Sequence, residues 1–529
     1  MKILAADGIA KKGIELLQKD FEVDVKDKLP AEELLEIIPQ YDAIIVRSAS
    51  KITKEVIDRA ENLKIIGRAG VGVDNIDIPA ATAKGIIVIN SPGGNTIAAT
   101  EHTMAMMLSM SRNIPIANET TQKGEWNRKK YTGVELRGKT LGIIGMGRIG
   151  SGVAKRAMAF DMDVIGYDPY LNEERAKALD VKVVSLDELI EKSDFITVHM
   201  PINDETRDMI NKDNIAKMKD GVRLINCARG GIINEQDLAD AVKSGKVAGA
   251  AIDVYTKEPP TDNPLRGLDH VVLTPHLGAS TVEAQIGVSL DVAHGIKAAL
   301  SGQPVSTAVN MPPVSAKAMS MIRPYLSLAE RLGVMAQDLS DGAVRQVEAE
   351  YDGKITEADT RMVTMAVLKG ILSPVLETNV NYVNAPGLAD ERNIDVKETK
   401  NAKKPAGFDS LISVRVNTEK DSIIIKGALF GEQGRIVDIN DFRVDVDPHA
   451  ELMVCPHENR PGIIGTVGTL LGQEGINISS MEVGKTSREG TNLMVLTLDS
   501  PASKNVMRKV VALDGIVDAK RVDFSVLNK

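Results

Sequence analysis

Short apolar runs alternate with segments of helical spacing from the first residues of the chain onward. Runs that predict strands occupy Ile3–Ala6, Ala43–Val46, Lys64–Ile66 and Ile86–Ile89, and Ile9–Leu17 has the spacing of an amphipathic helix. Strands that alternate with helices are typical of an α/β domain with a parallel sheet. The N-terminal part of the chain is therefore predicted to form such a domain.

A second alternation of the same kind starts at Thr140. Its apolar runs are Leu141–Ile144, Val164–Tyr167, Phe195–His199, Arg223–Asn226, Ala250–Asp253 and Val271–Thr274. Six such strands make a complete doubly wound sheet. Because this sheet begins so late, the earlier strands are expected to form a separate domain, completed by the helical segment from Glu283 to Leu300. The chain would then leave the first domain and re-enter it.

The C-terminal part of the chain has a different pattern. Ser301–Val314 is rich in turn and breaker residues, which predicts a linker. The next region, to about Pro448, combines helical spacing at Ile322–Leu339 with strands such as Ser422–Phe430. Its charged stretch Glu391–Lys404 predicts a solvated loop.

The last segment, Leu452–Lys529, has the order β-α-β-β-α-β. This is the order of a ferredoxin-like domain. The chain is thus expected to contain four structural units.

Composition narrows the possible partners and compartment. The 529 residues carry 64 basic and 73 acidic side chains, a formal net charge of -9, and only one tryptophan. Nucleic acid is therefore not predicted as a partner, because the net negative charge repels phosphate backbones and few aromatic side chains are present to stack on bases. The two cysteines, Cys227 and Cys455, cannot form a disulfide framework, and we expect no signal peptide and no membrane span. A cytoplasmic protein is predicted.

Three glycines directly follow the apolar strand Leu141–Ile144 and precede a helical segment. They are Gly145, Gly147 and Gly150, in the spacing GxGxxG. In dinucleotide-binding folds the first glycine permits a tight turn, the second lets the backbone approach the pyrophosphate, and the third lets helix and strand pack closely. The alternative is an ordinary glycine turn, but the strand and helix around the motif favour a nucleotide site.

Asp168 ends the strand Val164–Tyr167, 18 residues after Gly150. A carboxylate there can accept hydrogen bonds from the ribose hydroxyls and repels a 2′-phosphate. NAD is therefore favoured over NADP, and the alternative is an ordinary surface aspartate.

Polar residues at three further strand ends can serve the oxidation of a small 2-hydroxy acid. Arg229 offers a bidentate fork to a carboxylate, and His276 has a ring whose pKa suits an acid/base role near neutral pH. Glu258 could orient His276 as the third group of a triad does, and Asp253 could hold the nicotinamide carboxamide. Each has an ordinary alternative: a surface ion pair, a structural histidine or a solvated turn residue.

Cys227 is more simply a packing residue. Because no His/Cys cluster with ligand spacing occurs in the sequence, no metal site is predicted.

The motifs NCARGG, DVYTKEPP and TPHLGAST resemble those of the D-isomer-specific 2-hydroxyacid dehydrogenases. The resemblance implies Arg229 as carboxylate binder, His276 as general acid/base and Glu258 as its partner. It also implies NAD contacts, which it places at Arg148, Ile149, Asp168, Cys227 and Asp253.

The resemblance extends to members of that family that oxidise 3-phospho-D-glycerate to 3-phosphohydroxypyruvate. It implies that the loop RAGVGVDNID, including Gly70 and Val71, holds the substrate carboxylate with backbone N–H groups, with Asn95 nearby. Arg47 and Arg68 would bind the phosphate. Arg128 and Lys129, beside Trp126, could act from a neighbouring subunit. The alternative for these cations is a solvated surface charge.

The tail is similar to an ACT domain. In HENRPG and the following GIN, the resemblance implies His457, Asn459 and Asn477 as residues that hold L-serine between paired subunits, so feedback inhibition is expected; Asn477 could instead be a turn cap. A homotetramer is expected. The alternatives are a glyoxylate or hydroxypyruvate reductase, for which an amino-acid sensor has no evident use, and an NAD-sensing partner-binding protein, against which the three catalytic candidates argue.

The predicted fold class is α/β. A doubly wound parallel-sheet NAD domain is inserted in a flavodoxin-like substrate domain, and an α+β intervening domain and a ferredoxin-like ACT domain follow. The expected bounds are 1–98 with 283–310 for the substrate domain, 99–282 for the NAD-binding Rossmann domain, 311–450 for the intervening domain and 451–529 for the ACT domain.

Overall fold

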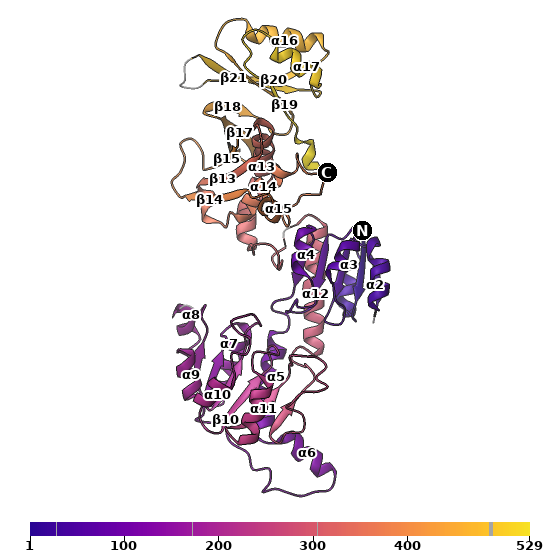
Figure 1. The fold of residues 1–529 in the computed structure, drawn as a ribbon, viewed down its shortest axis with the longest axis vertical. Helices are drawn as coiled ribbons and strands as arrows, with labels where there is room; N and C mark the ends of the chain where they lie inside the picture. The colour runs from indigo at the N-terminus through magenta and orange to yellow at the C-terminus, as the bar shows by residue number, and fades with distance from the viewer. Residues whose placement is uncertain (28, 172, 304, 486–489, 529) are drawn as a thin grey trace.

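The computed structural model describes residues 1–529 apart from 28, 172, 304, 486–489 and 529. Over the described residues the strands form four sheets, which follow one another along the long axis of the molecule (Figure 1). The N-terminal sheet lies between the second and third sheets, so the order in space differs from the order along the chain. Within the described part, no helix combines the length and apolar character needed to span a bilayer.

The N-terminal sheet has five parallel strands in the order β2-β1-β3-β4-β5, which is the flavodoxin-like order. Its strands are β1 (Lys2–Ala6), β2 (Glu22–Lys26), β3 (Ala43–Val46), β4 (Ile65–Arg68) and β5 (Ile87–Asn90). The helices around it are α1 (Lys11–Leu17), α2 (Ala31–Ile37), α3 (Lys54–Arg59), α4 (Ile78–Ala83) and α12 (Val282–Leu300). Strand β2 was not predicted, because it is a polar edge strand with no fully buried residue.

Helix α12 returns the chain to this sheet, as the hydrophobic pattern predicts. It packs on β4, β5 and α1, and Val292 and Ile296 lie in the same apolar core as Ile3 and Ile45. A Cβ at Gly67 of β4 would lie 2.4 Å from a methyl carbon of Val292. Glycine there lets the returning helix pack directly on the sheet.

The second sheet has seven parallel strands in the order β12-β11-β10-β9-β6-β7-β8. Its strands are β6 (Thr140–Ile144), β7 (Asp163–Tyr167), β8 (Lys182–Val183), β9 (Phe195–Val198), β10 (Val222–Asn226), β11 (Val247–Ile252) and β12 (Val271–Leu273). The six predicted strands are all present. The seventh, β8, escaped prediction because two exposed residues leave no apolar pattern.

The helices of this unit are α5 (Thr96–Ser111), α6 (Ile114–Gln122), α7 (Arg148–Met158), α8 (Glu173–Ala178), α9 (Leu186–Lys192), α10 (Lys212–Lys217) and α11 (Glu235–Ser244), and α6 projects from its end (Figure 1). Helix α5 connects the two sheets. It begins just after Gly94, where an added Cβ would meet Val288 of α12, and it then packs on α7 and against β10, β11 and β12.

The third sheet is mixed, in the order β14-β13-β15-β16-β17-β18. Its strands are β13 (Val344–Gly353), β14 (Asp395–Asn401), β15 (Ser410–Thr418), β16 (Ser422–Phe430), β17 (Gln433–Ile439) and β18 (Phe442–Val446), with helices α13 (Ala316–Leu339), α14 (Arg361–Leu372) and α15 (Ala385–Glu391). The helix predicted from Ile322 begins earlier, at Ala316.

The loop predicted at Glu391–Lys404 is wrong in part, because its centre forms β14. This strand pairs in parallel with β13, and every residue in it is exposed. Charged side chains are common on edge strands, where they discourage pairing with other chains. Charge alone therefore did not distinguish a protected edge strand from a loop.

The fourth sheet is antiparallel, in the order β20-β21-β19-β22. Its elements are β19 (Glu451–Glu458), α16 (Ile463–Gln473), β20 (Ile478–Lys485), β21 (Thr491–Leu498), α17 (Lys504–Val511) and β22 (Lys520–Val522). The predicted β-α-β-β-α-β order is confirmed.

Candidate active site

The glycine motif forms the turn between β6 and α7. Gly145 has φ +96°, and a Cβ there would lie 2.6 Å from the carbonyl oxygen of His199. A Cβ at Gly150 would lie 2.0 Å from the carbonyl oxygen of Gly145, whereas one at Gly147 would meet nothing within 4 Å. Gly145 therefore serves the tight turn, Gly150 serves the close packing, and Gly147 leaves the N-terminus of α7 open. An NAD pyrophosphate fits this arrangement.

Asp168 lies beside this turn, just after β7. One of its carboxylate oxygens accepts a hydrogen bond from the backbone N–H of Met146 at 2.8 Å, and the other accepts one from Tyr170 at 2.8 Å. These bonds orient the carboxylate next to the nucleotide turn, where a negative charge disfavours a 2′-phosphate.

The two residues after Gly147 differ in environment. The guanidinium of Arg148 donates a hydrogen bond to the carbonyl oxygen of Pro92 at 2.7 Å, so it bridges the second sheet to the segment after β5. Ile149 is half-buried and packs against the apolar core around β6.

His276 and Glu258 form a direct pair. His276 Nδ1 lies 2.9 and 3.1 Å from the two carboxylate oxygens of Glu258. The hydrogen bond with Glu258 raises the pKa of His276 above its ordinary value, against the opposing effect of burial. Partial burial acts to raise the pKa of Glu258, but the bond with His276 holds it below its usual value. The other ring nitrogen of His276 remains available to a substrate.

Arg229 lies near this pair, at the end of β10. Its positive charge acts to lower the pKa of His276. Asn226 holds the Arg229 loop, because its amide donates to the Arg229 carbonyl oxygen at 2.8 Å. The Arg229 side chain contacts Asp74 of the N-terminal sheet unit at 3.5 Å, so it lies where the two units meet.

Three arginines gather at this junction. Burial, then the positive charge of Arg229, and then that of Arg47, lower the pKa of Arg68. Arg68 Nε is buried without a hydrogen-bond partner among the described residues. Repelling, incompletely paired cations are expected where a ligand with several negative charges binds.

The loop after β4 makes room for these arginines. A Cβ at Gly70 would lie 1.5 Å from Arg68 Nη1, and one at Gly72 would lie 2.1 Å from Arg229 Nη2. Val71 accepts a hydrogen bond from the side chain of Asn90 at 2.6 Å. The loop is therefore shaped around both guanidinium groups.

Asn95 stands at the start of α5 without capping it. Its side-chain oxygen Oδ1 is buried and has no partner in the part of the chain that is described. A buried acceptor without a hydrogen-bond donor needs a partner, and a ligand bound where the two sheet units meet can supply it.

Asp253 and Cys227 lie deeper, behind the strand ends. Asp253 is fully buried, and its carboxylate accepts hydrogen bonds from the Thr274 hydroxyl and from the backbone N–H groups of Leu277 and Gly278. Burial raises the pKa of Cys227 to about 12, so this residue is a neutral thiol near neutral pH. It belongs to the packed interior around β6, α5 and β10.

Arg128 and Lys129 do not join the arginine cluster within one chain. They lie in the segment after α6, which extends from the far end of the second sheet (Figure 1). The side chains of residues 126–130 line a hollow of about 530 Å³, and Trp126 is 79% exposed. The segment therefore offers an apolar ring and several cations outside its own active site.

Of the three residues predicted to bind serine, two lie together and the third lies apart. His457 is buried at the end of β19, with Nδ1 2.8 Å from the Glu458 carbonyl oxygen and Nε2 without a described partner. Asn459 follows it and accepts a hydrogen bond from Asn492 at 3.0 Å. Asn477 is exposed and lies at the opposite end of β21. The strand register puts it about 20 Å from His457.

Two residues of this crevice were missed by the sequence analysis. His102 of α5 lies 3.2 Å from the carboxylate of Asp253, and Asp74 contacts Arg229. His102 belongs to no recognisable motif, and Asp74 lies within the loop RAGVGVDNID but was not singled out. One of seven histidines on an apolar helix could not be assigned without the packing of that helix.

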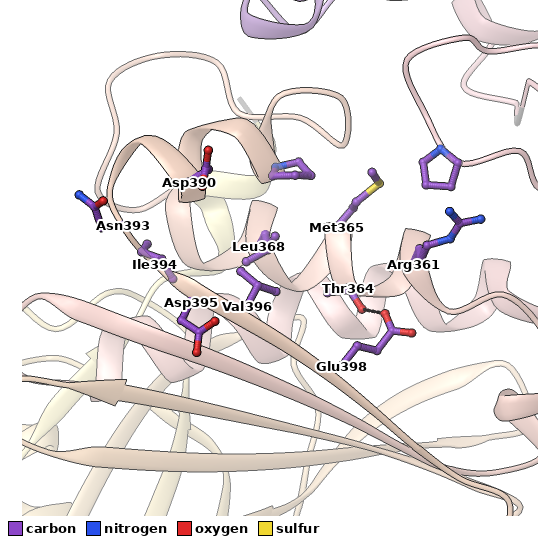
Figure 2. Close-up of a pocket in the computed structure, with 12 residues that line it drawn as sticks. Arg361, Thr364, Met365, Leu368, Asp390, Asn393, Ile394, Asp395, Val396 and Glu398 are labelled. Carbon is purple, nitrogen blue, oxygen red and sulfur yellow. Dashed lines mark hydrogen bonds between the residues drawn. The ribbon is translucent and has the colours of Figure 1, made fainter. Parts of the chain in front are cut away.

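A separate hollow of about 630 Å³ lies beside α14, α15 and β14 of the third sheet (Figure 2). Its two charged groups at one end are already paired: Arg361 with Asp359, and Glu398 with Thr360 and Thr364. The described residues contain no group of His, Cys, Asp or Glu side chains arranged to hold a metal ion.

Comparisons with known proteins agree with this geometry. Three family models match: the D-isomer specific 2-hydroxyacid dehydrogenase NAD-binding domain over 104–278, the D-3-phosphoglycerate dehydrogenase intervening domain over 321–440, and the ACT domain over 457–515. The D-3-phosphoglycerate dehydrogenases of Archaeoglobus fulgidus and Bacillus subtilis are 46% and 44% identical to this chain, over 99% of it and over 100% and 99% of their own lengths.

A solved structure of a glyoxylate reductase from Paecilomyes thermophila is also similar, with a TM-score of 0.55 and 33% identity. The match covers 58% of this chain and 98% of that one. Part of this chain therefore has no counterpart in the shorter protein.

Proposed function

The chain belongs to the D-isomer-specific 2-hydroxyacid dehydrogenases, in the D-3-phosphoglycerate dehydrogenase branch that carries intervening and ACT domains, and we infer from this that it oxidises 3-phospho-D-glycerate to 3-phosphohydroxypyruvate. It is an NAD-dependent oxidoreductase acting on a CH–OH group. This reaction is the first step of L-serine synthesis.

The observation that carries this proposal is the gathering of three arginines where the first two sheet units meet, together with the His276–Glu258 pair. Arg47, Arg68 and Arg229 provide more positive charge than a monocarboxylic acid needs. A phosphorylated hydroxy acid has a carboxylate and a phosphate to occupy them. We propose that Arg229 with the Gly70–Val71 backbone and Asn95 holds the carboxylate, and that Arg47 and Arg68 hold the phosphate.

His276 is proposed to remove the C2 hydroxyl proton. Glu258 fixes the ring through Nδ1 and stabilises the imidazolium that forms. NAD, held along the glycine turn beside Asp168, would supply the acceptor for the hydride that leaves C2. Arg229 is proposed to polarise the developing carbonyl group at C2.

The cofactor would lie along the turn between β6 and α7. The residues proposed to contact it there are Gly145, Gly147, Arg148, Ile149 and Gly150. Asp168 would accept hydrogen bonds from the hydroxyls of the adenosine ribose. Cys227 was expected to contact NAD, and Asp253 was expected to hold the nicotinamide carboxamide. Because Asp253 is fully buried whereas Cys227 is half-buried, we propose that Asp253 supports the nicotinamide pocket from behind its lining and that Cys227 contacts NAD.

A decisive test is NADH formation with 3-phosphoglycerate compared with glycerate and glycolate. We expect preference for the phosphorylated acid of about tenfold or more, because hydrogen bonds to charged groups contribute roughly 1.5–3 kcal/mol each. Arg68→Met should remove this preference. Arg59→Met is the matched control, because Arg59 is exposed on α3 and paired only loosely with Glu55 at 4.0 Å.

The alternatives make different predictions in the same assay. A glyoxylate or hydroxypyruvate reductase would turn over the unphosphorylated acids at least as well, and an NAD-sensing binding protein would turn over none. Either result would contradict the proposal.

We propose that L-serine is the effector of the ACT domain. The buried, unpartnered Nε2 of His457 and the amide of Asn459 lie together at one end of its sheet, and Asn477 of a second subunit would complete the site. Serine titration of the assay tests this proposal, and absence of inhibition at any pH near neutral would contradict it.

The remaining proposals concern assembly and location. A homotetramer is proposed, because the residues proposed to bind serine are separated within one chain and the Trp126 segment presents cations outside its own active site. A cytoplasmic location is also proposed. Sedimentation of the purified protein tests the tetramer. The domain bounds given above are likewise proposed, and limited proteolysis should cut within 301–315, where the chain has no helix or strand among its described residues.

A further inference from the structure

Asp253 holds three consecutive backbone N–H groups of the loop that carries His276. Its carbonyl oxygen accepts from the N–H of His276 at 2.9 Å. Its carboxylate oxygens accept from Leu277 at 2.8 Å and from Gly278 at 2.9 Å. One residue thus determines where the acid/base residue and the two following residues lie.

This loop has a conformation that requires such support. His276 has φ +55°, in the left-handed region, which residues other than glycine rarely adopt without compensating contacts. The ring contact between His276 and Glu258 depends on this backbone position. Loss of the bonds to Asp253 would let the loop relax and the ring move away from Glu258.

The Asp253 carboxylate is itself held by side chains. Oδ1 accepts the Thr274 hydroxyl at 2.6 Å and lies 3.2 Å from Nε2 of His102. Burial acts to raise the pKa of Asp253, but the hydrogen bonds from His102, Thr274 and Leu277 hold it below its usual value. A fully buried carboxylate needs these donors to stay ionised and in place.

His102 comes from α5, the helix that connects the two sheet units. Only 18% of its side chain is exposed, and its Nε2 also lies 3.4 Å from the Thr274 hydroxyl. Seven residues before His102, Asn95 directly precedes α5 and is proposed to contact the substrate carboxylate. The helix therefore contacts the substrate end and the base end of the same crevice.

We propose that His102 is a positioning residue for the reaction. It donates from Nε2 to Asp253, and through Asp253 it sets the position of the His276 backbone and hence the His276–Glu258 contact. This inference rests on the proposed role of His276 in the oxidation described above. The groups whose charge acts on His276 are Glu258, Asp253 and Arg229.

The test compares His102→Leu, which removes the donor, with His102→Gln, whose amide can restore it. His102→Leu should lower kcat about tenfold while KM for NAD and for phosphoglycerate changes less than twofold. It should also move the acid limb of the kcat/KM profile to lower pH, because a weakened contact with Glu258 no longer raises the pKa of His276. His102→Gln should recover most of both changes.

Two further variants keep the test decisive. Thr274→Val removes the second side-chain donor to Asp253 and should reproduce the shift in the pH profile, even if His102→Leu fails to fold. Glu101→Gln, on the same helix but directed to Arg156 at 3.7 Å, should leave kcat and the profile unchanged. Wild-type turnover measured alongside distinguishes failure of this inference from failure of the proposed function.

A purely structural role would give a different result. It would lower the melting temperature and the fraction of active sites but leave the pH profile of the remaining activity in place. That outcome in both His102→Leu and Thr274→Val, or no rescue by His102→Gln, would overturn the proposal.

Discussion

The junction between the first two sheets and the ACT sheet place their candidate ligand-binding residues in opposite ways. At the junction, one chain brings together the arginines and the His276–Glu258 pair from residues far apart in sequence. In the ACT sheet, one chain places His457 and Asn459 at one end of β21 and Asn477 at the other. The proposed catalytic residues thus come together within one chain, whereas the proposed serine site would need two chains.

The largest expected effect is on the crevice. His276→Ala should lower turnover by about 10²–10⁴, the usual contribution of general acid/base catalysis, with NAD affinity little changed. Steady-state rates together with NADH binding by fluorescence measure the two quantities separately. Serine binding to the ACT domain should persist in this variant. Retention of activity would exclude His276 as the base.

A smaller effect is expected from substituting Glu258, the partner of His276. Glu258→Gln removes the carboxylate that raises the pKa of His276, so the acid limb of kcat/KM for hydroxy-acid oxidation should move to lower pH. The reason is that the base must be neutral, and a lower pKa keeps it neutral in more acidic solution. We expect a loss of about a hundredfold at the optimum, the lower end of the acid/base range. An unmoved limb would show that another group titrates.

The ACT side of the comparison is tested by Asn459→Ala. Loss of a hydrogen bond to a charged ligand costs roughly 1.5–3 kcal/mol, so the serine concentration for half-inhibition should rise about tenfold or more. Turnover without serine should stay at the wild-type value. Asn492→Ala, which removes the donor to Asn459, should give a smaller shift in the same direction. Unchanged inhibition in Asn459→Ala would place the sensor elsewhere.

The smallest effect concerns the junction between the third and fourth sheets. Burial raises the pKa of Asp338 on α13 to about 6, and its carboxylate accepts the backbone N–H of Asp523. Since the folded state binds this proton more tightly than the unfolded state, stability from this group is lost as pH rises from about 4 to 6. Asp338→Asn should therefore stabilise the protein by about 1–2 kcal/mol at pH 8 and less at pH 5. Thermal melting at both pH values measures this, and equal shifts would contradict it.

Much of the fold was predictable because strand patterns are local. The six strands from Leu141 to Thr274, the returning helix α12 and the ferredoxin-like order all follow from apolar spacing. Two polar strands, β2 and β8, were missed, and β14 was taken for a loop. Each lies at a sheet edge, where one neighbour is absent and little apolar pattern is needed.

The sequence by itself determined the identity and order of the reactive groups. The glycine turn, Asp168, Arg229, Glu258 and His276 follow strands of one parallel sheet, and parallel strands bring their carboxyl ends to one edge. Only the tertiary structure decided that Asp253 supports the His276 loop and that His102 reaches Asp253 from α5. It also decided that Asn477 lies apart from the other two residues proposed to bind serine. These depend on packing between helices and on sheet register, which join positions far apart in the chain and leave no periodic trace in it.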